Sequence, residues 1–306
     1  MPIHYTIVKL AHASELDVDD LKPYIKDADI VFPEQTNQTT ERTKEIEASH
    51  RDILINNRRR LENVFGLMKA ATSLTDSPRY NTFLNAFLFE QQKPKLFLER
   101  IPLGNHPVDE EVRMFLLHGN IPLAMQFQYQ ESICWVNQTR TRDVHMVETM
   151  ATIEGRIEEL YPHVGKRLRN KETLQGLMPI GAAHRPEIMM RKKGIPYAIV
   201  TLDTSIERVR SSGAALGIQM YKDDLTRRSD AYTQLLVATL LEKAIFLTYE
   251  KIYSPGLTSL PYHIVQGMGI DHLNDLGKYL RKAPDEGKVK AIRQYFADQG
   301  KPLPRS

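Results

Sequence analysis

Three polar side chains in this chain of 306 residues stand at positions where they could take part in chemistry. They are His12, Glu34 and His184, and each closely follows one of the apolar, β-rich runs 3–10, 28–33 and 177–180. Runs of this kind are typical of strands. In open α/β sheets, ligands bind outside the carboxyl ends of the strands, so a side chain there is better placed for chemistry than one on a helix face.

The segment that contains His184 predicts a strand, a tight turn, a helix and a second strand. Residues 181–183, Gly-Ala-Ala, let the backbone turn sharply without side-chain collision. Pro186 suits the first turn of a helix, which we expect over residues 187–193. The β-rich run 197–202 follows as the next strand. This segment is one β-α-β unit with an imidazole at the end of its first strand.

A second unit of the same kind opens the chain. Residues 3–10 predict the first strand, Ser14 can cap the helix that follows, and residues 28–33 predict another strand. Together the two units indicate an α/β fold with a small, mainly parallel sheet built from β-α-β units.

Most of the remaining sequence has apolar residues at helical spacing. We expect helices over residues 41–74, 78–92, 108–118, 139–160, 204–216 and 230–253, and shorter helices over 262–296. Residues 121–136 fit either a strand or a buried helix. Residues 95–101 could be a further strand, carrying Glu99 and Arg100 as reserve candidates for the site.

This order of elements predicts a single domain over residues 1–306. It would consist of the sheet, a mostly helical insertion at 35–140, a helical C-terminal region at 204–300 and a disordered tail with Pro302 and Pro304. Residues 139–160 place Arg142 and Asp143 in the first turn of their helix. A cation near a helix start is unfavourable to the helix dipole, so either another interaction favours Arg142 there or the side chain is exposed.

The composition is that of an ordinary globular protein. Its formal net charge of +3, from 41 basic and 38 acidic side chains, gives no reason to expect nucleic acid as a partner. The single cysteine, Cys134, excludes an intramolecular disulfide, and we expect it to be a buried structural thiol. We recognise no signal peptide and no run of ~20 apolar residues, so we expect a cytoplasmic protein without a membrane span. Secretion without a cleavable signal and the oligomeric state are left open.

Four short motifs occur in an order that resembles a known family. They are Lys9-Leu10-Ala11-His12, the strand from Asp29 to Glu34, Thr141-Arg142-Asp143-Val144-His145-Met146, and Gly181-Ala182-Ala183-His184. Over residues 3–202 the chain is similar to the TraB/PrgY/Tiki family, which also takes in erythromycin-esterase and ChaN-like proteins. Members of that family have G-x-x-H at two strand ends, a strand glutamate and a helix that opens with E-R-[ND]-x-x-M. Lys9 stands where the family has its first glycine, and Thr141 where it has a glutamate.

The resemblance implies a hydrolase with His12, Glu34, Arg142 and His184 at its site and a small-molecule or peptide substrate. In a metal-dependent peptidase, His12, Glu34 and His184 would hold a divalent ion such as Mn, Co or Zn and leave a position for water. In a metal-free esterase, His12 or His184 would deprotonate water, Glu34 would fix the tautomer and Arg142 would stabilise the oxyanion.

The alternative is a non-catalytic binding protein in which the site has degenerated. A Lys9 side chain paired with Glu34 would favour that interpretation. A resemblance that is accidental would place His12 and His184 on different sides of the molecule.

Overall fold

The computed structural model describes residues 3–10, 15–34, 40–56, 78–98, 109–202, 211–223, 230–249 and 260–304. The chain divides into two compact units, Met1–Gly104 with Thr139–Ile206, and Asn105–Gln138 with Glu207–Ser306. The sequence-based prediction of one domain did not separate these two units.

The first unit is built on a four-stranded sheet. Its strands are β1 (Ile3–Leu10), β2 (Ile30–Val31), β3 (Leu174–Gly181) and β4 (Tyr197–Thr201), in the order β2-β3-β1-β4, and all of their pairings are parallel. The α/β fold with a small parallel sheet is therefore confirmed. Leu10 pairs with Gly181, so β1 and β3 end at the same edge of the sheet.

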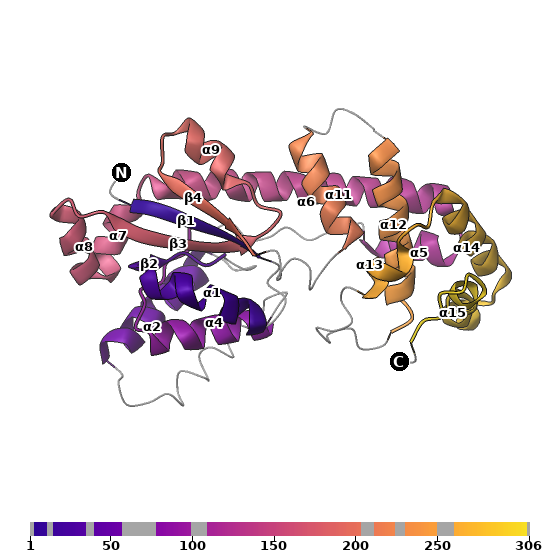
Figure 1. Cartoon of the computed structure of the whole chain (residues 1–306), viewed down its shortest axis with the longest axis horizontal. Coiled ribbons are helices and arrows are strands. Elements are labelled where there is room, and N and C mark those ends of the chain that lie inside the picture. Colours follow the sequence, from indigo (N-terminus) through magenta and orange to yellow (C-terminus); the bar gives the residue numbers. More distant parts are fainter. Residues whose placement is uncertain are drawn as a thin grey trace. The chain divides into compact units, whose positions relative to one another are not determined.

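Helices cover both faces of this sheet (Figure 1). They are α1 (Glu15–Asp27), α2 (Thr40–Asn56), α4 (Pro78–Glu90), α7 (Ile153–Leu160), α8 (Pro162–Arg169), α9 (Pro186–Lys192) and the last part of α6 (Ile121–Met150). Val8 and Leu10 of β1 face α1 and α4. Tyr5 and Ile7 face the opposite side, where α6, α7, α8 and α9 pack. The alternation of a strand thus gives β1 two buried faces, each fully buried Leu or Ile contributing about 1.5–3 kcal/mol.

Of the strand expected over residues 95–101, the described part, residues 95–98, forms a single bridge between Lys95 and Val31. Phe97 shows why the pairing stops. Its N–H donates to Glu47 Oε1 over 2.8 Å, and its carbonyl accepts from Arg156 Nη1 over 2.9 Å. Because side chains of α2 and α7 take these backbone groups, they are not available for a strand ladder. Glu99 and Arg100 lie outside the described residues.

Helix α6 settles the ambiguity at residues 121–136, because these residues form one continuous helix with those up to Met150. The helix expected over 139–160 is interrupted by a turn at residues 151–152 before α7 begins. The prediction that Arg142 and Asp143 lie in a first turn is therefore wrong, since both lie well inside α6. Cys134, on the same helix, is exposed and not buried as expected.

The second unit is helical. It contains α5 (Asp109–Leu117), the first part of α6, α11 (Ser212–Lys222), α12 (Asp230–Phe246), α13 (Leu260–Val265), α14 (Ile270–Lys282) and α15 (Lys288–Asp298). The expected helix at 204–216 begins at Ser212 in the part that can be described. No helix in the described ranges has the length and apolar character needed to cross a membrane.

The C-terminal tail is ordered as far as Pro304, in contrast to the prediction. The backbone N–H of Lys301 donates to the carbonyl of Phe296 over 2.8 Å. Arg293 Nη1 donates to the carbonyl of Pro304, also over 2.8 Å. Leu303 packs against the core of the helical unit. These contacts hold the last described residues, 301–304, against α15 in spite of their two prolines.

Candidate functional site

A cluster of charged side chains lies at the carboxyl ends of β2 and β3. Glu34 follows β2, His184 follows β3, and Arg142 and Asp143 come from α6. Glu34 Oε1 accepts a hydrogen bond from Arg142 Nη2 over 2.6 Å and lies 3.1 Å from His184 Nε2. The other ring nitrogen, Nδ1 of His184, lies 2.6 Å from Asp143 Oδ1. One imidazole therefore joins two carboxylates.

Backbone N–H groups hold the remaining carboxylate oxygens. Gly181 donates to Glu34 Oε2 over 2.8 Å, and Arg185 donates to Asp143 Oδ2 over 2.6 Å. A Cβ atom at Gly181 would lie 3.3 Å from Glu34 Oε2, so the small residue at this turn gives the carboxylate close access to the backbone. The turn predicted at residues 181–183 thus places both His184 and Glu34.

The environment of His184 favours the imidazolium form. Its side chain is 4% exposed, and that of Asp143 is 1% exposed. Burial alone would lower the pKa of His184, but the charges of Glu34 and Asp143 and their hydrogen bonds outweigh it and raise the pKa to about 10. At neutral pH both ring nitrogens therefore carry protons and donate to the carboxylates.

The raised pKa of His184 predicts a fall in stability with rising pH. The pKa of His184 is 6.5 in the unfolded chain and about 10 in the folded chain, so between these two pH values the folded chain binds more protons than the unfolded chain. The free energy that His184 contributes to folding is thus complete below pH 6.5 and lost as the pH passes through about 10. From pH 6.5 to 8 we expect a loss of about 1.5 kcal/mol relative to a His184→Gln variant. Urea unfolding of both proteins across this pH range measures the difference. If the unfolding free energy changed equally with pH in the two proteins, the prediction would be contradicted.

The structure brings together three of the four residues that the sequence put forward. Glu34, Arg142 and His184 lie in one cluster, whereas His12 lies outside the described residues. The strand before His12 ends at the same edge, since the N–H of Ala182 donates to the carbonyl of Leu10 over 3.0 Å. The sequence reasoning did not place Asp143 in the site, although its position directly after Arg142 was a signal that could have found it.

Lys9 does not pair with Glu34, the contact that would have favoured a degenerate site. Its Nζ lies 3.0 Å from Glu187 Oε2 and also donates to the carbonyl of His184. Burial lowers the pKa of Lys9, and the charge of Glu187 partly restores it. Lys9 thus connects β1 to the first turn of α9 and to the backbone of His184.

The described donors do not fit a divalent ion as they stand. A metal needs the lone pair of a neutral imidazole, whereas both nitrogens of His184 face carboxylates. Both oxygens of Glu34 also accept hydrogen bonds. In the parts of the chain that can be described, no three metal-ligating side chains form a group that could hold an ion. The metal site with His12 stays a prediction.

No family model, curated protein or solved structure matches the chain. The similarity to the TraB/PrgY/Tiki family therefore rests on the four quoted motifs and stays a prediction.

Proposed function

We propose that the chain is a hydrolase for an ester or amide bond of a small-molecule or peptide substrate, with Glu34, Arg142, Asp143 and His184 as its active site. The observation that supports this is the continuous hydrogen-bonded series Asp143–His184–Glu34 at the carboxyl edge of a parallel sheet. Glu34 is the end of the series that solvent reaches best, with a side chain 15% exposed against 1% for Asp143.

The protonation state of His184 assigns the roles. An imidazolium cannot accept a proton from water, so in the proposed reaction the carboxylate of Glu34 removes it as the hydroxide adds to the carbonyl carbon. The bond to the leaving group then breaks, and that group takes up the proton from Glu34. His184 keeps its own protons and stabilises Glu34, while Asp143 orients the imidazole. Arg142 would stabilise the negative charge on the carbonyl oxygen.

The second candidate is the binding protein without catalysis. The observation that favours it is the degree to which the cluster is already satisfied, because every carboxylate oxygen of Glu34 and Asp143 has a donor. Such a network can also serve to fix the position of α6 against the strand ends.

A Glu34→Gln variant tests the proposal. Purified chain would be assayed with panels of aryl esters and peptides, with chelator and with added Mn, Co or Zn. Removing the base should lower kcat/KM at least about 100-fold. The matched control is Glu172→Gln, since Glu172 pairs with Arg167 on an exposed part of the same unit and should keep activity within about twofold. Absence of turnover by the wild type across the panels, or full activity of Glu34→Gln, would overturn the hydrolase proposal.

A further inference from the structure

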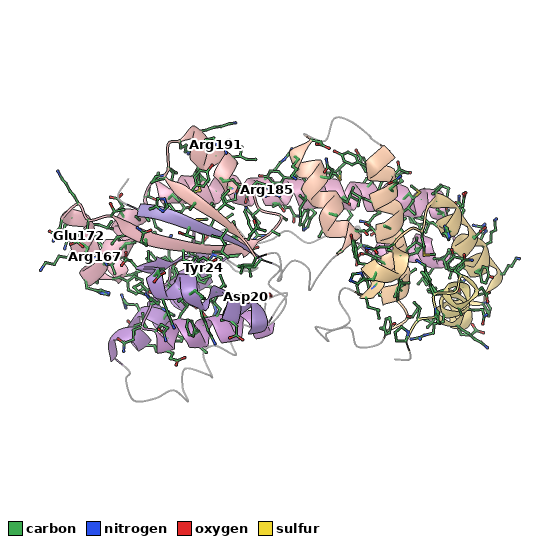
Figure 2. The ribbon with its side chains drawn as sticks, in the orientation of Figure 1. Asp20, Tyr24, Arg167, Glu172, Arg185 and Arg191 are labelled. Atoms are coloured by element: carbon green, nitrogen blue, oxygen red, sulfur yellow. The ribbon has the colours of Figure 1, made fainter. Side chains whose placement is uncertain are left out.

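Arg185, the residue after His184, has a guanidinium group that the rest of the described chain does not satisfy. Its Nε atom is buried and has no hydrogen-bond partner among the described residues. Among the described residues, the guanidinium contacts the carboxylate of Glu187, whose Oε1 lies 3.6 Å from Nη1, which is longer than a hydrogen bond. The side chain is still 23% exposed, so a ligand can reach part of it. Figure 2 labels Arg185 near the carboxyl ends of the strands.

Three of the carboxylate oxygens around Arg185 already accept other hydrogen bonds. Both oxygens of Asp143 accept hydrogen bonds, one of them from the backbone N–H of Arg185 itself. Glu187 Oε2 accepts from Lys9 Nζ. A buried donor without an acceptor is unfavourable, and what Arg185 Nε lacks is a hydrogen-bond acceptor.

The net charge of the cluster also favours the binding of an anion near Arg185. Within the described residues it holds four cationic side chains, namely Lys9, Arg142, Arg185 and the protonated His184. Counted over these described side chains alone, they face the three carboxylates already named, which leaves one positive charge in excess. A local excess of this sign attracts an anion.

We propose that Arg185 binds an anionic group, a carboxylate or a phosphate, on the substrate. The guanidinium presents its N–H groups as a planar fork that matches two oxygens of either group. The substrate of this site would then carry that anionic group close to the bond that is cut. That the bound anion belongs to a substrate rests on the proposed hydrolase function, whereas the anion site itself does not.

The test is calorimetric titration of the full chain with inorganic phosphate and with malonate, a dicarboxylate. Whichever anion the wild type binds, Arg185→Gln should bind it at least about tenfold more weakly, because a charge-assisted bond is lost. Arg185→Lys keeps the charge without the fork and should also bind more weakly than the wild type. The control is Arg191→Gln on α9, whose Nε contacts the hydroxyl of Tyr197 at 3.3 Å on the exposed surface, and its affinity should stay within about twofold.

Binding of neither anion by the wild type, or equal affinity in Arg185→Gln, would overturn the inference. The anion that binds, phosphate or malonate, shows whether the site takes a phosphate or a carboxylate. The measurement is of binding and needs no turnover, so its outcome is independent of the hydrolase test. Anion binding that depends on Arg185 in a chain without hydrolytic activity would leave the anion site in place and make the chain a binding protein.

Discussion

An Asp143→Ala variant is expected to lose about 3–5 kcal/mol of unfolding free energy at neutral pH. Asp143 is buried, its Oδ1 lies 2.6 Å from His184 Nδ1 and its Oδ2 accepts from the N–H of Arg185. Removing it leaves a buried imidazolium with Glu34 as its remaining carboxylate and leaves a backbone donor unpaired. Alanine favours a helix more than aspartate does, so the loss would occur against the helix propensity at this position of α6.

The matched control is Asp52→Ala on α2. Asp52 also pairs with a cation, Arg51, but its side chain is 55% exposed, and such pairs contribute about 0–1 kcal/mol. Hydrogen exchange of the β1 and β3 amides measures the free energy in the unit that contains both positions. The same samples give the pKa of His184 by NMR, which should be lower in Asp143→Ala because one of its two carboxylates is gone. Equal stability of the two variants would show that the buried pair does not form in solution.

The sheet and part of the site could be predicted because their signals are local. The turn at Gly181, Pro186 at the start of α9 and the β-rich runs on either side specify one β-α-β unit without knowledge of the rest of the chain. Since the carboxyl ends of parallel strands share one edge, Glu34 and His184 could be expected to meet there. The structure confirms that meeting.

The sequence analysis placed Asp143 in a first turn and not in the interior of α6, because the apolar periodicity of that helix is interrupted. Buried positions repeat along α6 at Ile121, Ala124, Gln128, Ser132 and Val136. Two of these five are polar: Ser132 Oγ donates to the carbonyl of Gln128 over 2.9 Å, and Gln128 Nε2 donates to Ser132 Oγ over 3.4 Å. An apolar pattern cannot show such positions, and the helix therefore could not be extended back from residue 139.

The pair between Lys9 and Glu187 was equally hidden from the sequence. A lysine at the end of a strand gives no signal of its partner, and the two residues are far apart in the chain. The sequence analysis considered Glu34 as a partner of Lys9 in a degenerate site, since Lys9 lies near the end of one predicted strand and Glu34 follows another. The face of β1 on which Lys9 lies determines a different partner. Lys9 lies on the same face of β1 as Ile7, where α9 packs and brings Glu187 within 3.0 Å of Nζ.

A Lys9→Met variant is expected to lose about 3 kcal/mol, since methionine has a similar length but no charge. Glu187, whose side chain is 10% exposed, would keep only the ion pair with Arg185 at 3.6 Å among its described contacts. The carbonyl of His184 would lose a donor as well. The control is Lys192→Met on the exposed surface of α9, which should change stability by less than about 0.5 kcal/mol.

Combining Lys9→Met with Glu187→Leu gives the sharper result. A buried ion pair replaced on both sides by apolar groups is often close to neutral, so the double variant should be more stable than Lys9→Met alone. We expect a coupling energy of about 1.5–3 kcal/mol from the double-mutant cycle, measured by hydrogen exchange of β1. Additive losses would mean that the two side chains do not interact. Lys9 would then stabilise the fold through the carbonyl of His184, and Glu187 would pair with Arg185 instead of Lys9.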